Sequence, residues 1–164
     1  MFARWLTKRS LLLLLLHNTS CKGTQDFMYL QLAQPRLAEV KGIGIDIASI
    51  SKIASLVSRY NSETLTLLFT PDEIEQCQSA PHSSRSYAVC FSAKEAVGKA
   101  LGTGLVDINW NEIETVIVQS GLTIKLRGAA QQKALQCGVK AWLATWCYWD
   151  DYVMVHVLSK GEQA

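Results

Sequence analysis

SSRSYAVCFSAKEAVGKALGTG, residues 83–104, is the part of the sequence with the strongest helix signal. The stretch is rich in alanine, lysine and glutamate, which favour helices over other conformations. It leads to Gly102, a residue type that readily takes the left-handed conformation found just after many helices. We therefore predict a helix that starts at Ser83 or Ser84, ends at Leu101 and is stopped by the glycine.

Upstream, residues 42–47 read GIGIDI, a short apolar run with β-branched residues that predicts a buried strand. Strand alternation places Asp46 on the same face as Gly44, where the missing side chain lets another group approach closely. A carboxylate in such a strand is costly unless it is paired or bound to a cation. Position alone leaves two interpretations open: Asp46 belongs to a charged site, or it caps the following helix.

The remaining segments form a block of helices followed by strands, one helix and more strands. Helix caps and apolar spacing predict short helices after Ser49 through Val57, over 61–68, over 71–79 with a capping box at Thr70, and over 129–137. Period-two alternation predicts strands at 113–118, 122–126, 140–148 and 152–158, paired as two hairpins. Because helices and strands are segregated, we expect an α+β fold with a largely antiparallel sheet packed with helices.

The chain has 164 residues and a mass of 18.2 kDa, with 49% hydrophobic and 18% charged residues. This composition indicates one globular domain and excludes a disordered chain. We assign residues 39–164 to the domain and residues 1–38 to an N-terminal extension. Residues 1–25 contain basic side chains and no acid, so the net charge of +2 conceals an excess of acids in the rest of the chain. No basic run indicates nucleic-acid binding.

The N-terminal extension begins MFARWLTKRSLLLLLLHNTSCKG, residues 1–23. Its six leucines would span roughly 9 Å as a helix, far less than the ~30 Å core of a bilayer, so we predict no membrane span. Three interpretations stay open. The segment is a non-structural extension, including sequence upstream of a true start at Met28, or an organellar transit peptide without acids, or a secretory signal with a short apolar run and a poor cleavage site.

Five cysteines, an odd number without any C-x-x-C spacing, support neither a disulfide framework nor a zinc site: Cys21, Cys77, Cys90, Cys137 and Cys147. We expect reduced and mostly buried thiols, as in proteins of the cytosol. The expected location is therefore the cytoplasm, or an organelle if the extension is a transit peptide.

The residues with the clearest chemistry lie at the end of the long predicted helix. Glu95 and Lys99 are four residues apart and share a helix face, a pairing that is most often a solvated surface bridge. Flanking alanines allow close packing there, however, and the glycine turn at 102–104 follows at once with backbone N–H groups suited to a phosphate. With Asp46, these groups suit a magnesium–pyrophosphate site, since Mg²⁺ binds one or two carboxylates, waters and phosphate oxygens.

The pairing of GIGIDI with FSAKEAVGKALGTG resembles the holo-acyl-carrier-protein synthase branch of the 4′-phosphopantetheinyl transferases. That family has a G-x-D-I strand followed by Arg-Ile, and then R-x-L-A-x-R-F-A-x-K-E-A-x-x-K-A-x-G-T-G. The resemblance covers about Val40 to Lys160 with similar spacing between the motifs. It implies the fold of that family.

The resemblance also implies roles for individual residues. Asp46 and Glu95 correspond to ligands of Mg²⁺. Glu95 is the implied general base, directly or through a metal-bound water, and Lys99 lies near the pyrophosphate and stabilises the leaving phosphate. The implied coenzyme A-binding residues are Arg85, Lys99, Gly102 and Gly104.

Two positions depart from the family pattern. Lys52 stands where the pattern has the arginine of Arg-Ile, which keeps the charge and loses the planar bidentate group. Cys90 replaces the second arginine and loses the charge, so we assign it no phosphate contact. It is either a reactive thiol or a thiol packed on the helix face, and we favour the second. Tyr148 or Trp149 lies where some members have a histidine, and we expect a structural role for His156.

The implied reaction transfers 4′-phosphopantetheine from coenzyme A to a serine of an apo acyl carrier protein of fatty-acid, polyketide or other metabolism, leaving adenosine 3′,5′-bisphosphate. The resemblance also implies a homotrimer, since family members of this size typically form trimers. For an acidic carrier we expect a local basic patch at Lys52 and Arg59, seven residues apart on one helix face. Two alternatives remain: a noncatalytic member that binds coenzyme A or a carrier, and a structural α+β protein in which the motif is only a charge cluster.

Overall fold

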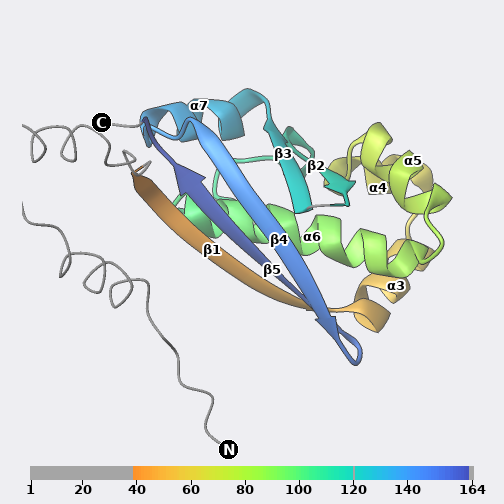
Figure 1. The fold of residues 1–164 in the computed structure, drawn as a ribbon. Coiled ribbons are helices and arrows are strands. Elements are labelled where there is room, and N and C mark those ends of the chain that lie inside the picture. The colour runs from red at the N-terminus through yellow and green to blue at the C-terminus, as the bar shows by residue number, and fades with distance from the viewer. Residues whose placement is uncertain (1–38, 120, 163–164) are drawn as a thin grey trace, which may run out of the picture. The chain divides into compact units, whose positions relative to one another are not determined.

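A computed structural model describes residues 39–119 and 121–162 (Figure 1). The interpretations of residues 1–38 concern a segment outside these ranges, and the domain boundary at residue 39 stays a prediction. The elements, in order, are β1 Val40–Ser49, α3 Ile50–Arg59, α4 Ser62–Leu68, α5 Pro71–Ser79, α6 Ser83–Ala100, a 3₁₀ helix Trp110–Glu112, β2 Ile113–Val118, β3 Gly121–Leu126, α7 Gly128–Gln136, β4 Ala141–Trp149 and β5 Tyr152–Lys160. Among the helices described, none is both long and apolar enough to cross a bilayer.

The strands form one antiparallel sheet in the order β1-β5-β4-β3-β2, which confirms the expected α+β class. The first strand therefore lies at an edge, beside the last strand of the chain. Helix α6 runs behind the sheet in the view of Figure 1. Every predicted helix and strand is found within about two residues of its expected ends, and the 3₁₀ helix at 110–112 was not predicted.

The contact between β1 and α6 is a backbone-to-backbone contact. A β-carbon on Gly42 would lie 2.0 Å from the carbonyl oxygen of Ala100, and one on Gly44 would lie 1.8 Å from that of Ala96. No side chain larger than hydrogen fits at either glycine without separating strand and helix. This confirms that the glycine face of β1 receives a closely packed neighbour, and it places Asp46 beside the helix.

The prediction that residues 42–47 form a buried strand is wrong for the opposite face of β1. Ile43, Ile45 and Ile47 are 63%, 48% and 53% exposed. The reason is that α6 covers one face of β1, while the isoleucines alternate onto the other. Leu143 of β4 lies on the same outer face, because Ile43 and Leu143 both pair with Leu158 of β5.

A buried ion pair joins α5, α6 and β2. Lys94 is fully buried, its Nζ lies 2.7 Å from Oε2 of Glu73, and it also donates to the carbonyl of Ile113. Glu73 completes the predicted capping box with Thr70 and accepts a further bond from the backbone N–H of Thr115. Burial raises the pKa of Glu73 and lowers that of Lys94, and the attraction between the two opposes both shifts. Removing one partner would leave an uncompensated buried charge.

Candidate active site

Asp46, Glu95 and Lys99 come together where β1 crosses the second half of α6. Nζ of Lys99 lies 2.7 Å from Oδ1 of Asp46 and 3.0 Å from the carbonyl oxygen of Ile45. Lys99 of α6 therefore forms its ion pair with Asp46 of strand β1. The helix-capping interpretation of Asp46 is wrong, because Ser49 accepts the capping bond at the start of α3.

The electrostatics of this cluster centre on Glu95. Its partial burial raises the pKa of the carboxyl group, the negative charge of Asp46 raises it further, and the positive charge of Lys99 opposes both. The Asp46 side chain is 13% exposed and that of Lys99 is 46% exposed. The cluster is therefore accessible from solvent on the lysine side, and it holds a carboxyl group that retains its proton more readily than an ordinary glutamate.

The donor set suits a hard divalent cation that is shared with a phosphate. Asp46 and Glu95 supply two carboxylates close enough for the charge of one to raise the pKa of the other, and a cation between them would relieve that repulsion. Among the described residues, no group of three or more histidine, cysteine, aspartate or glutamate side chains could hold a metal. Mg²⁺ commonly takes one or two carboxylates and completes its shell with water and substrate phosphate.

The glycine turn follows directly after α6. Gly102 and Gly104 have φ of 81° and 63°, in the left-handed region, and a β-carbon at either would meet nothing within 4 Å. The side-chain space beside this turn is open, which leaves room for a ligand close to the backbone. Gly98 lets the turn pack closely against α6, because a β-carbon on Gly98 would lie 2.8 Å from the carbonyl carbon of Gly104.

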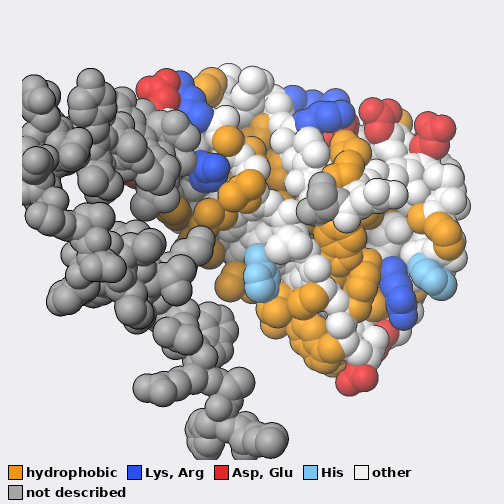
Figure 2. Space-filling model, in the orientation of Figure 1, with side chains coloured by type: hydrophobic (Ala, Val, Ile, Leu, Met, Phe, Trp, Pro, Cys, Tyr) orange, Lys and Arg blue, Asp and Glu red, His pale blue; other side chains and the backbone are white. Residues whose placement is uncertain are grey.

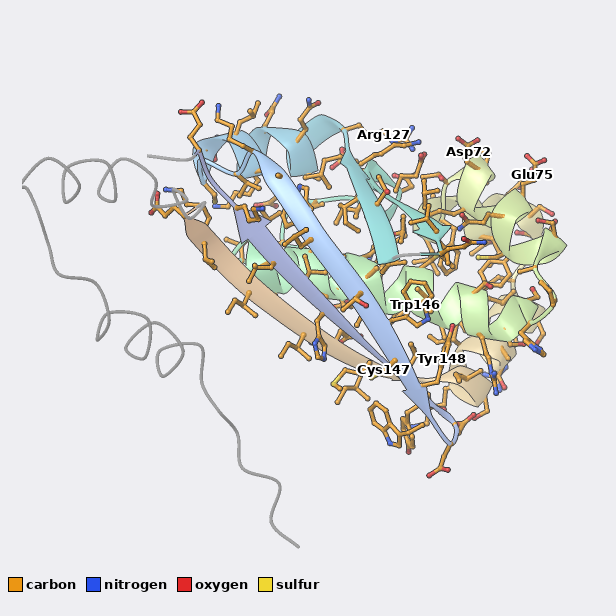
Figure 3. All side chains as sticks on the ribbon, viewed as in Figure 1. Asp72, Glu75, Arg127, Trp146, Cys147 and Tyr148 are labelled. Atoms are coloured by element: carbon orange, nitrogen blue, oxygen red, sulfur yellow. The ribbon has the colours of Figure 1, made fainter. Side chains whose placement is uncertain are left out.

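Arg85 lies apart from this cluster. It is exposed near the start of α6, ten residues before Glu95, which corresponds to about 15 Å along a helix. Its guanidinium stands over the ring of Tyr148, 5.3 Å from the centroid. Tyr148 lies near the end of β4 beside Cys147 (Figure 3). The cation–π contact was not predicted, since only the fold brings the two residues together.

Lys52 and Arg59 lie exposed on α3, as the seven-residue spacing predicts. Both border an open groove of about 410 Å³ that is also lined by Ser51, Ser55, Leu56 and Tyr60. Ile53, on the opposite side of the helix, is buried in the core. The amphipathic character of α3 is confirmed, and the assignment of its polar face to a carrier stays a prediction.

Cys90 is a packed thiol, as favoured from the sequence. It is fully buried on α6 with its sulfur 3.7 Å from that of Cys77, and this neighbour and burial raise the pKa of Cys90 well above the usual value of a thiol. A raised thiol pKa disfavours the reactive thiolate. Cys147 is exposed, so the expectation of mostly buried thiols is wrong at this position. His156 lies exposed on the outer face of β5.

The family model of the 4′-phosphopantetheinyl transferase superfamily matches residues 42–155 of the chain. The holo-[acyl-carrier-protein] synthase of a Geobacter species is 40% identical over 104 residues, which cover 62% of this chain and 83% of that relative. The holo-[acyl-carrier-protein] synthase of Desulforudis audaxviator is 33% identical over 123 residues, which cover 74% of this chain and 94% of that relative.

Two solved structures show the same likeness. The holo-[acyl-carrier-protein] synthase from Neisseria meningitidis aligns with a TM-score of 0.65 and 25% identity, covering 74% of this chain and 99% of that one. The enzyme from Helicobacter pylori in complex with coenzyme A aligns with a TM-score of 0.61 and 27% identity, covering 72% and 99%. The five-stranded sheet and its helices are thus the fold of these synthases.

Proposed function

The chain belongs to the 4′-phosphopantetheinyl transferase superfamily, and from that premise we propose that it carries out the reaction of the holo-[acyl-carrier-protein] synthases with Asp46, Glu95 and Lys99 as its centre. It transfers 4′-phosphopantetheine from coenzyme A to a serine of an apo acyl carrier protein and releases adenosine 3′,5′-bisphosphate. The observation that carries the proposed centre is the convergence of β1 and α6, with Lys99 2.7 Å from Asp46 and with Glu95 near enough for the charges of both to act on its carboxyl group.

The reaction forms a bond between the serine oxygen and the β-phosphorus of coenzyme A. It breaks the bond from that phosphorus to the bridging oxygen, and the serine proton passes to a base. We assign the base to Glu95, directly or through a metal-bound water, because its partly buried carboxyl group lies near enough to Asp46 and Lys99 for the charges of both to act on it. Lys99 places an ammonium next to the carboxylates, where it offsets the charge that develops on the leaving phosphate.

Mg²⁺ held by Asp46 and Glu95 would neutralise pyrophosphate charge and polarise the phosphoryl group. The backbone N–H groups of the turn at Gly102 and Gly104 would bind phosphate oxygens, because the open space beside these glycines admits a ligand. Arg85 would bind a more distant anionic part of coenzyme A, since about 15 Å of helix separates it from Glu95. Stacking on Tyr148 holds its guanidinium in place for that contact.

The carrier would dock on the polar face of α3. Lys52 and Arg59 border one groove there, and both side chains are exposed. Acyl carrier proteins are acidic, so two cations on one face supply the local attraction that the net acidic body lacks. Lysine at position 52 gives this attraction without a bidentate contact.

We also assign the chain a homotrimeric state. The outer face of β1, β5 and β4 carries Ile43, Ile45 and Leu143, and these exposed side chains line a groove of about 430 Å³. Hydrophobic side chains spread over these strands in Figure 2. A contiguous exposed apolar face marks a protein interface, and in a closed trimer it would pack against a different surface of the neighbouring copy. Light scattering on the purified protein in solution measures the mass of the assembly, which should be three times that of one chain.

Intact mass of an apo carrier after incubation with the protein, coenzyme A and Mg²⁺ tests the function. The carrier should gain one phosphopantetheinyl group. An unmodified carrier, with folded protein that still binds coenzyme A in the presence of Mg²⁺, would instead support the noncatalytic alternative. Absence of both binding and transfer would support the structural alternative. We place the reaction in the cytoplasm, or in an organelle if residues 1–38 hold a transit peptide, because the number and spacing of the cysteines support no disulfide framework.

A further inference from the structure

The start of α3 is held by the turn between β4 and β5. Helices leave their first N–H groups without partners inside the helix. Here the N–H of Ile50 donates to the carbonyl oxygen of Asp151 at 2.7 Å, and that of Ser51 donates to Oδ1 of Asp151 at 3.0 Å. The N–H of Lys52 donates to Oγ of Ser49 at 3.2 Å. Two of these three bonds therefore end on a single residue of the distant turn.

The second carboxylate oxygen of Asp151 binds two hydroxyl groups at the same end of α3. Oδ2 accepts hydrogen bonds from the hydroxyl groups of Ser49 and Ser51, each at 2.6 Å. These bonds lower the pKa of Asp151, so it is a charged carboxylate at the positive end of a helix. Figure 1 shows the β4–β5 turn beside the start of α3, although about a hundred residues of sequence separate them.

We propose that Asp151 is a positioning residue for carrier recognition, which fixes the first turn of α3 and with it Lys52. This inference rests on the proposed docking of the carrier on α3. The helix has ten residues, too few to be stable alone in water, so the order of its first turn depends on outside partners. Lys52 is the third residue of the helix, directly after the two residues whose N–H groups Asp151 binds.

The direction in which carrier affinity changes when the Asp151 side chain is removed distinguishes positioning of α3 from a direct effect of the Asp151 charge. Asp151 brings a negative charge close to Lys52, where an acidic carrier would bind. If Asp151 acted by its charge alone, its removal would strengthen carrier binding. If it positions the helix, its removal lets the first turn fray, and the affinity falls with the fraction of molecules that keep the ordered start.

The experiment compares Asp151→Ala with Asp150→Asn. Asp150 is the neighbour in the same turn, has φ of 48°, a conformation that asparagine tolerates, and its replacement removes the same charge without touching the bonds to α3. Steady-state kinetics with wild type give KM for the carrier, KM for coenzyme A and kcat. Asp151→Ala should raise the carrier KM about threefold or more and leave kcat and the coenzyme A KM unchanged. Asp150→Asn should leave the carrier KM unchanged or lower it.

Hydrogen exchange at Ser51 and Lys52 completes the test, because the Ser51 N–H donates to the Asp151 side chain and the Lys52 N–H donates to Ser49, which that side chain also binds. These amides should exchange faster in Asp151→Ala and normally in Asp150→Asn. A carrier KM that is unchanged or lowered in Asp151→Ala, despite faster exchange, overturns the proposal. Unchanged exchange overturns it as well. Failure of the docking proposal gives a different result: Lys52→Glu with Arg59→Glu then leaves the carrier KM unaffected, while the exchange measurement still reports on Asp151.

Discussion

Gly44→Ala should push β1 away from α6 and disturb the three charged residues that this contact brings together. The added β-carbon would lie 1.8 Å from the carbonyl oxygen of Ala96 and 2.9 Å from the backbone nitrogen of Ala100. Both neighbours are backbone atoms of a helix and cannot rotate away. Strand and helix must therefore separate by about an ångström or more to remove the overlap.

This separation predicts two measurable losses. Overpacking of a tight core contact costs about 1–3 kcal/mol of unfolding free energy, which urea unfolding measures. Asp46 follows Gly44 by two residues, and Glu95 precedes Ala96, so the shift also moves Asp46 relative to Glu95. A misplacement of about 1 Å at a reacting centre can lower the rate by up to ~10²-fold, so kcat/KM for the carrier should fall by far more than the folded fraction does.

Leu122→Ala is the matched control for stability. Leu122 is 7% exposed in β3, which is separated from β1 by β4 and β5, and its truncation should cost about 2–5 kcal/mol. At a temperature where both variants are folded, Leu122→Ala should keep its activity per folded molecule while Gly44→Ala loses it. Wild-type stability and activity of Gly44→Ala would refute the reasoning, as would equal losses of activity in the two variants.

Three further predictions concern the charges. Lys99→Ala should lower kcat more than it raises the KM for coenzyme A in steady-state kinetics, whereas an equal loss of binding would make Lys99 a ground-state anchor. Lys52→Glu with Arg59→Glu should raise the carrier KM at low salt, less so at moderate salt, and leave the coenzyme A KM unchanged; a collapse of coenzyme A affinity would place Lys52 at the nucleotide. Burial and the charge of Asp46 raise the pKa of Glu95 in the metal-free protein, so titration of its carboxyl group by NMR without Mg²⁺ should place it above the usual glutamate range, and Mg²⁺ should lower it. A Glu95 carboxyl group that titrates in the usual glutamate range without metal, or is unaffected by Mg²⁺, contradicts the placing of Glu95 beside Asp46 at a cation site.

Local signals predicted the elements because each depends on neighbouring residues. Thr70, Pro71 and Glu73 start α5 through a capping box whose parts lie within four residues. Gly102 ends the long helix with a positive φ, as its residue type suggests. The alternation in GIGIDI likewise indicated which residues share a face with Asp46, and the structure places α6 on that face.

Features that depend on the arrangement of distant elements could not be predicted in this way. Alternation shows that β1 has two faces, but only the packing of α6 on one of them shows that Ile45, on the other face, is exposed. Asp151 looks like an ordinary turn residue until the fold places it at the start of α3. Lys94 has the spacing of a helix-surface charge, and its burial against Glu73 follows from the packing of α5 on α6.

The rate of holo-carrier formation by Asp46→Asn and Glu95→Gln, followed by intact mass with coenzyme A and Mg²⁺, tests the proposed centre most directly. Each substitution removes a carboxylate and keeps the size of the side chain. Glu63→Gln, on the exposed side of α4, is the control for loss of one negative charge. Both site variants should be folded and at least ~10²-fold slower than wild type, while the control keeps the wild-type rate. Folded variants of Asp46 and Glu95 that modify the carrier at the wild-type rate would contradict the assignment of the reaction to this cluster.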